Sequence, residues 1–101
     1  MKIIFEYIYR DTCYGEVCIE NDRYVEAEVK DFAEIALPPC DKKVKIAADG
    51  ETVLLQFPNG FKVTAGYEKT PFEYEESYEL FGDARYNELS GTVRLEKKDR
   101  R

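Results

Sequence analysis

Residues 51–65 read ETVLLQFPNGFKVTA, and this stretch decides the fold class. A run rich in β-branched and aromatic residues leads into Pro58-Asn59-Gly60, which is a typical turn sequence. A second run of the same kind follows the turn and predicts the returning strand of a β-hairpin. The register that suits this hairpin places every large apolar residue on one face. The facing pairs in that register are Phe57 with Phe61, Leu55 with Val63, and Val53 with Ala65.

Strand patterns recur on both sides of this hairpin. Residues 2–10, KIIFEYIYR, are β-branched and aromatic, and they predict a strand with Ile3, Phe5 and Ile8 buried. Residues 43–47, KVKIA, predict another strand that ends in a turn at Asp49-Gly50. Near the end of the chain, Ser90-Gly91 is expected to turn into a last strand over 92–96.

A second hairpin is expected over residues 16–30. Residues 11–15, DTCYG, predict a turn before it, and apolar and charged residues alternate along its second half. A three-residue loop at Asn21-Asp22-Arg23 would place the apolar residues on one face. The pairs in that register are Ile19 with Val25 and Val17 with Ala27.

Residues 71–81 fit two kinds of secondary structure. Thr70 can cap a helix, Pro71 suits its first position and Gly82 can end it, so these signals favour a short helix laid on a sheet. Aromatic residues and glutamates also alternate as they would in a strand, and only Glu76 breaks that alternation. We expect the helix and keep the strand as the alternative.

Residues 31–37 also fit two kinds of secondary structure. Asp31 can cap one helical turn that Pro38-Pro39 must end, and a continuing strand fits equally well. The whole pattern predicts a mainly β domain, either all-β or α+β. We expect a small antiparallel barrel or sandwich of about six to seven strands, with at most one or two short helices at about 31–37 and 71–81.

A chain of 101 residues suits a single domain, which we assign to residues 1–96. Residues 97–101 are basic and are expected to form a frayed tail.

The net charge of −6 argues against direct binding to nucleic acid or to an anionic membrane, because phosphate groups require Lys and Arg. An odd count of three cysteines at irregular spacing is unlike a secreted disulfide framework, so we expect a cytoplasm, including the cytoplasm of a host cell.

Catalytic and cofactor motifs are missing from the sequence. It contains no histidine, which removes the commonest general base and most zinc and iron sites. It also lacks a glycine-rich phosphate loop, and Asp41, Asp49 and Glu51 do not have the spacing of a calcium loop. The sequence therefore predicts a protein that is not an enzyme and binds neither a metal nor a cofactor.

Acidic and aromatic residues gather between Lys69 and Arg85, where the chain has no Lys or Arg. Such a surface can bind a basic protein partner, because carboxylates along a rigid element imitate a phosphate backbone. Phage-encoded inhibitors of host nucleases, including anti-CRISPR proteins, are often similarly small and acidic, an analogy of size and charge only. The alternatives are a β-barrel that binds a small ligand or acts as an enzyme, and a structural or assembly subunit. The residues expected to bind the partner are Glu73, Tyr74, Glu75, Glu76, Tyr78, Glu79 and Asp83.

Overall fold

A computed structural model describes residues 1–13, 15–38 and 43–96, except for the side chains of Tyr78, Leu80 and Asp83. The described residues form eight strands and no helix, and the fold is all-β. In chain order the strands are β1 (Lys2–Cys13), β2 (Glu16–Glu28), β3 (Phe32–Ala36), β4 (Lys43–Asp49), β5 (Thr52–Gln56), β6 (Lys62–Ala65), β7 (Thr70–Leu80) and β8 (Asp83–Glu96).

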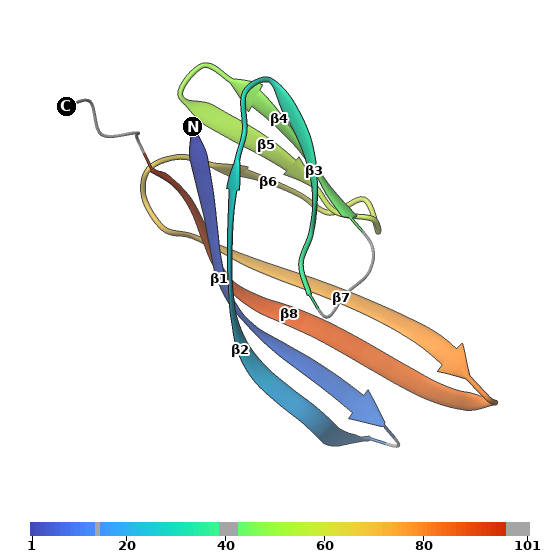
Figure 1. The fold of residues 1–101 in the computed structure, drawn as a ribbon. Helices are drawn as coiled ribbons and strands as arrows, with labels where there is room; N and C mark the ends of the chain where they lie inside the picture. The colour runs from blue at the N-terminus through green and yellow to red at the C-terminus, as the bar shows by residue number, and fades with distance from the viewer. Residues whose placement is uncertain (14, 39–42, 97–101) are drawn as a thin grey trace.

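The strands form two antiparallel sheets of four strands each, as Figure 1 shows. Sheet A has the order β2-β1-β8-β7, and sheet B has the order β3-β4-β5-β6. The chain passes from sheet A to sheet B between β2 and β3 and returns between β6 and β7. The expected small antiparallel β fold is thus confirmed, and it takes the form of a sandwich.

The hairpin expected over residues 51–65 is confirmed in its register. β5 pairs with β6 so that Val53 lies opposite Ala65 and Leu55 opposite Val63. The amide of Phe57 donates to the carbonyl of Phe61 at 2.8 Å, which closes the turn. The local turn chemistry and the facing apolar pairs therefore agree with the global fold.

The core lies between the two sheets. From sheet A it takes alternate residues of β1, led by Ile3 and Phe5, because successive strand residues point to opposite faces. Sheet B contributes a matching set from β4, β5 and the turn after it, including Ile46 and Leu55. Phe57 stacks between Phe72 and Tyr74 of β7, with ring centroids 5.7 and 5.2 Å away. The stacked aromatic rings bind the turn of sheet B to the edge strand of sheet A.

Sheet A is much longer than sheet B. The molecule measures 53 × 23 × 17 Å, and the hairpins β1–β2 and β7–β8 run out past sheet B (Figure 1). Along these strands the core ends at Tyr9, Tyr74 and Leu89. We call the strand segments beyond that point, residues 10–20 and 75–88, the arm.

The helix expected at 71–81 is wrong, and at 31–37 the strand alternative holds, because both segments are strands. Residues 70–80 pair along their whole length with β8, and residues 32–36 pair with β4. Strand pairing is favoured over the helix that the capping signals around Thr70 predict, because the pairing buries Phe72 and Tyr74 against sheet B. The described residues contain no helix long and apolar enough to cross a membrane.

The expected hairpin at Asn21-Asp22 is also wrong. β2 runs straight through these residues, and Asn21 lies opposite Tyr9 of β1. The turn expected over 11–15 is shorter than predicted, because β1 continues to Cys13. Ile8 is exposed rather than buried, since it lies on the opposite face from Ile3 and Phe5.

Ser90-Gly91 makes no turn and lies inside β8, opposite Ile8 and Tyr7. A side chain at Gly91 would place its Cβ 2.1 Å from the carbonyl oxygen of Glu6 and 2.5 Å from Cα of Tyr7. Glycine is therefore required here by the close approach of β1 and β8, not by a turn. The basic tail expected at 97–101 lies outside the described residues.

Candidate protein-binding face

The face of sheet A that points away from sheet B, which we call the outer face, carries acids from all four strands and more acids than bases. No layer of the described structure covers it (Figure 1). The cross-strand register and the alternation of side chains place its described acids there: Glu6, Glu20, Asp22, Glu26, Glu28, Glu73, Glu75, Glu79, Glu88 and Glu96. Its described bases are Lys2, Arg10 and Arg94.

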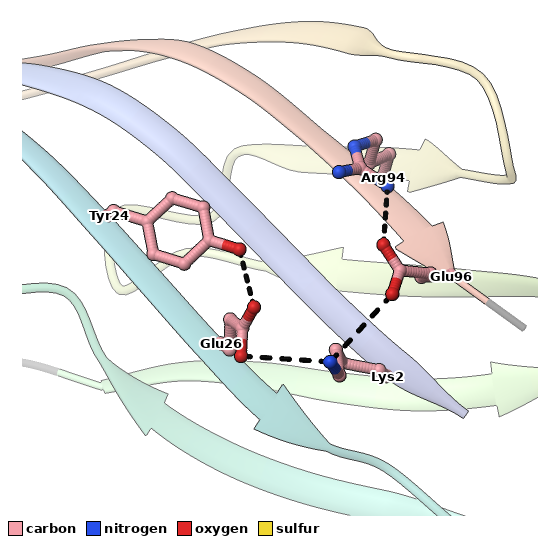
Figure 2. A network of polar contacts seen from close by, with 5 residues as sticks. All are labelled: Lys2, Tyr24, Glu26, Arg94 and Glu96. Atoms are coloured by element: carbon pink, nitrogen blue, oxygen red, sulfur yellow. Dashed lines mark hydrogen bonds and ion pairs between the residues drawn. The ribbon is translucent and has the colours of Figure 1, made fainter. Parts of the chain in front are cut away.

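One end of the outer face neutralises its own charge. Lys2 lies 3.7 Å from both Glu26 and Glu96, and Arg94 lies 3.1 Å from Glu96. The Tyr24 hydroxyl donates a hydrogen bond to Glu26, and this contact completes the network drawn in Figure 2. These contacts leave little free acidic charge at this end for a partner.

Arg10 has the same role at the start of the arm. Its guanidinium lies 2.5 Å from Glu20 on one side and 3.3 Å from Glu88 on the other. The hydrogen bond to Glu20, together with the charges of both carboxylates, raises the pKa of Arg10 above its ordinary value. Arg10 therefore bridges β2, β1 and β8 and neutralises the middle of the face.

The acids of the edge strand β7 are different. Glu73, Glu75 and Glu79 are exposed, and no described Lys or Arg lies within ion-pair distance of them. Tyr86, on the neighbouring strand, donates a hydrogen bond to Glu75, and this bond, followed by burial, raises the pKa of Tyr86 to about 12. The described partner of Glu75 is thus a tyrosine hydroxyl rather than a cation.

The outer face is hollowed next to these acids. A hollow of about 750 Å³ is lined by Asn59, Phe61, Pro71, Glu73 and Glu75, together with residues 90–92 of β8. A second hollow of about 500 Å³ also touches residues 90–92, and its other lining includes Glu6, Asp22 and Tyr24. The small side chains of Ser90 and Thr92 and the bare backbone of Gly91 leave room there. Because Asn59, Phe61 and the buried Phe72 also line the larger hollow, it lies where the edge strand β7 meets the turn of sheet B, whereas the smaller one lies over β1, β2 and β8.

The tip of the β7–β8 hairpin exposes an aromatic ring in an unfavourable backbone conformation. Phe81 has a φ of 53°, followed by Gly82 at 82°, as in a two-residue hairpin turn that favours Asn-Gly. A bulky residue in this left-handed region is uncommon and strained. Its side chain is 96% exposed, so no described packing compensates for the strain.

The residues expected to bind a partner are divided between the two faces. Glu73, Glu75 and Glu79 lie on the outer face, as a surface role requires. Tyr74 is 4% exposed and belongs to the core. Glu76 lies on the inner face, where its carboxylate accepts a hydrogen bond from the Tyr74 hydroxyl at 2.5 Å. Tyr78 and Asp83 are in β7 and β8, but their side chains lie outside the described structure.

Acids of the outer face that lie far from residues 70–82 in the chain were not predicted from the sequence. Glu6, Asp22 and Glu88 join the outer face only through the pairing of β1 with β2 and β8. Residues 16–37 hold seven acids against two bases, and this density is the signal that could have indicated Asp22. By contrast, the outer face of sheet B carries Lys43, Lys45 and Lys62 beside Glu34.

Comparisons with protein-family models, with curated proteins and with solved structures found no match to this chain. The described residues contain no group of three or more Cys, Asp or Glu placed to hold a metal ion. The geometry and charge of the outer face are therefore the features that bear on function.

Proposed function

We propose that this chain is a non-catalytic binding protein whose outer face of sheet A docks on a basic protein surface. The observation that carries the proposal is the uncovered sheet face with acids from all four strands. Charge complementarity of this kind steers association and selects partners of opposite sign.

The free acids on β7 support this choice of partner. Glu73, Glu75 and Glu79 are spaced along one rigid strand, and their repulsion has no described cation to relieve it. A surface with only a structural role would gain from mixed charges, as the network around Lys2 does. A basic partner would supply the positive charge that this edge of the sheet lacks.

Apolar groups near the acids, from sheet A and from the β5–β6 turn of sheet B, support a protein partner over a simple counter-ion. Phe61 and Pro71 line the larger hollow, Tyr24 lines the smaller one, and Phe81 projects at the tip of the arm. Exposed aromatic side chains provide contact area in protein interfaces.

The partner class that best fits this chemistry is a nucleic-acid-binding protein. Such proteins present grooves rich in Arg and Lys for the phosphate backbone, and an acidic sheet of this length can occupy such a groove. We therefore propose inhibition by nucleic-acid mimicry, acting in a cytoplasm, as phage-encoded inhibitors do. Neither direct binding to nucleic acid nor binding to a membrane is part of the proposal.

The proposal is tested with a fluorescent oligo-arginine peptide bound to duplex DNA. We expect the wild-type chain to release the peptide from DNA. A variant with Asp22→Asn, Glu73→Gln, Glu75→Gln and Glu79→Gln should bind the peptide roughly tenfold more weakly, because steering by clustered charge is worth about that much or more. Fluorescence anisotropy over a series of salt concentrations measures the affinity and its salt dependence.

The matched control removes the same number of charges elsewhere, through Glu34→Gln, Asp49→Asn, Glu51→Gln and Glu68→Gln. These acids are exposed and do not belong to sheet A's outer face. The control should retain most of the affinity. If both variants lose affinity equally, only net charge matters and the outer face is not a binding site.

A further inference from the structure

Two cysteines meet at the end of the β1–β2 hairpin because of a β-bulge. Asp11 lies opposite Ile19, and the next residue, Thr12, lies opposite Val17, so Cys18 is the extra residue of β2. The following pair is Cys13 with Glu16. The bulge therefore brings Cys18 back towards the strand position that Cys13 occupies.

The contacts of the two thiols agree with this register. Sγ of Cys18 donates to the carbonyl of Glu16 at 3.7 Å, and Glu16 is the cross-strand partner of Cys13. Cys13 also shares a hydrogen bond with Cys18, and this bond, followed by burial, raises the pKa of Cys13. The register and this interaction place the two thiols close together at the end of the β1–β2 hairpin.

The two thiols differ in their access to solvent. Both are free, but Cys13 is buried at 9% exposure whereas Cys18 is exposed. A small oxidant in solution can thus react first with Cys18. The buried thiol of Cys13 is then available to react with the oxidised Cys18. This is the arrangement of a reacting and a resolving cysteine.

We propose that Cys13 and Cys18 form a reversible redox pair that closes to a disulfide with a low-molecular-weight disulfide such as oxidised glutathione. The Cys18 thiolate attacks the glutathione disulfide, which forms a mixed disulfide and releases one reduced glutathione. The Cys13 thiolate then attacks Sγ of Cys18 and releases a second glutathione, which takes up a proton. The two cysteines lose two electrons and two protons in all, and one glutathione disulfide becomes two thiols.

The bridge would join β1 to β2 at the bulge, at the end of the arm. The ring would enclose residues 14–17, that is, the turn and the first two residues of β2, so closure needs a local adjustment at the hairpin end and leaves the sandwich intact. Oxidation would therefore fix the shape of this hairpin end without unfolding the chain. The inference is independent of the proposed function, since neither thiol belongs to the acidic set.

The test uses the full chain with Cys40→Ser, because Cys40 lies outside the described residues and would otherwise compete. After incubation with oxidised glutathione, we expect intact-mass spectrometry to show the loss of two hydrogen atoms and no glutathione adduct. Alkylation in denaturant should then label neither cysteine, and dithiothreitol should restore both thiols. Cleavage after Glu16 should leave the peptides of Cys13 and Cys18 joined.

Two variants distinguish the pair from an ordinary surface thiol. Cys13→Ser should stop at the glutathione adduct on Cys18, and Cys18→Ser should react far more slowly, because Cys13 is buried. A stable glutathione adduct in the chain that keeps both cysteines would overturn the proposal, whether or not either serine variant folds. So would oxidation that joins two chains instead of closing one.

Discussion

Replacing Gly91 with alanine is expected to destabilise the fold by about 3 kcal/mol or more, the upper part of the usual range for overpacking. The added Cβ would lie 2.1 Å from the Glu6 carbonyl oxygen and 2.5 Å from Cα of Tyr7, and both of these are backbone atoms. Neither can rotate away, so β1 and β8 would have to separate in the middle of sheet A. Urea unfolding followed by circular dichroism measures the loss.

Gly66→Ala is the matched control for this substitution. The nearest atom to its added Cβ is a side-chain methyl of Thr52 at 4.0 Å, which is an ordinary contact. We expect a change in the free energy of unfolding within about 0.5 kcal/mol. Equal stability of the two alanine variants would contradict the close approach of β1 and β8 at Gly91.

Replacing Phe57 with alanine is expected to cost about 3–5 kcal/mol, as for other large aromatic side chains removed from a core. Phe57 is 2% exposed, and its ring stacks on Phe72 and Tyr74 of the other sheet. Its loss would weaken the contact between the sheets as well as the hairpin turn. The free energy of unfolding and the amide exchange of β7 should both change.

Phe32→Ala provides the comparison for Phe57→Ala. Phe32 is an aromatic residue on the outer face of sheet B and is 60% exposed. Its replacement should change stability by less than about 1 kcal/mol, since little apolar area is lost from the interior. A Phe57→Ala chain as stable as this control would show that the two sheets are not held together at this turn.

The sequence predicts local pairing well and distant pairing poorly. The hairpin over 51–65 was predicted with its register because the turn residues and facing apolar pairs lie within one short segment. The strand over 70–80 was only the alternative to a helix, because its partner, β8, lies beyond a two-residue turn that contains Phe81 instead of the usual Asn. Glu76, which breaks the alternation, lies on the inner face of β7 just beyond Tyr74, where the core of that strand ends.

Polar residues inside long strands explain the remaining errors. Asn21 and Asp22 resemble a turn, yet they continue the edge strand β2 past the end of the core, where an apolar face is not required. Gly91 resembles a turn residue, yet it marks a close backbone approach that only the pairing with β1 reveals.

The residues of the candidate site were likewise predicted where they are close in sequence and not where distant strands bring them together. The acids of β7 were predicted from their local density, whereas Glu6 and Asp22 belong to the same face only through the register of sheet A. The placement of Tyr74 in the core also depends on the turn at Phe57 in the other sheet. Local composition thus found one strand of the face, and long-range pairing defined the rest.

The most direct test of the proposed face is a map of amide chemical shifts during titration with the oligo-arginine peptide. We expect the largest shifts along β7 and residues 90–92 of β8, with weaker shifts around Asp22, and we expect all of them to shrink as salt screens the charges. The strands of sheet B should change little. Shifts spread evenly over both sheets, or centred on the acidic turn at Asp49 and Glu51, would contradict the claim that the outer face of sheet A binds a basic partner.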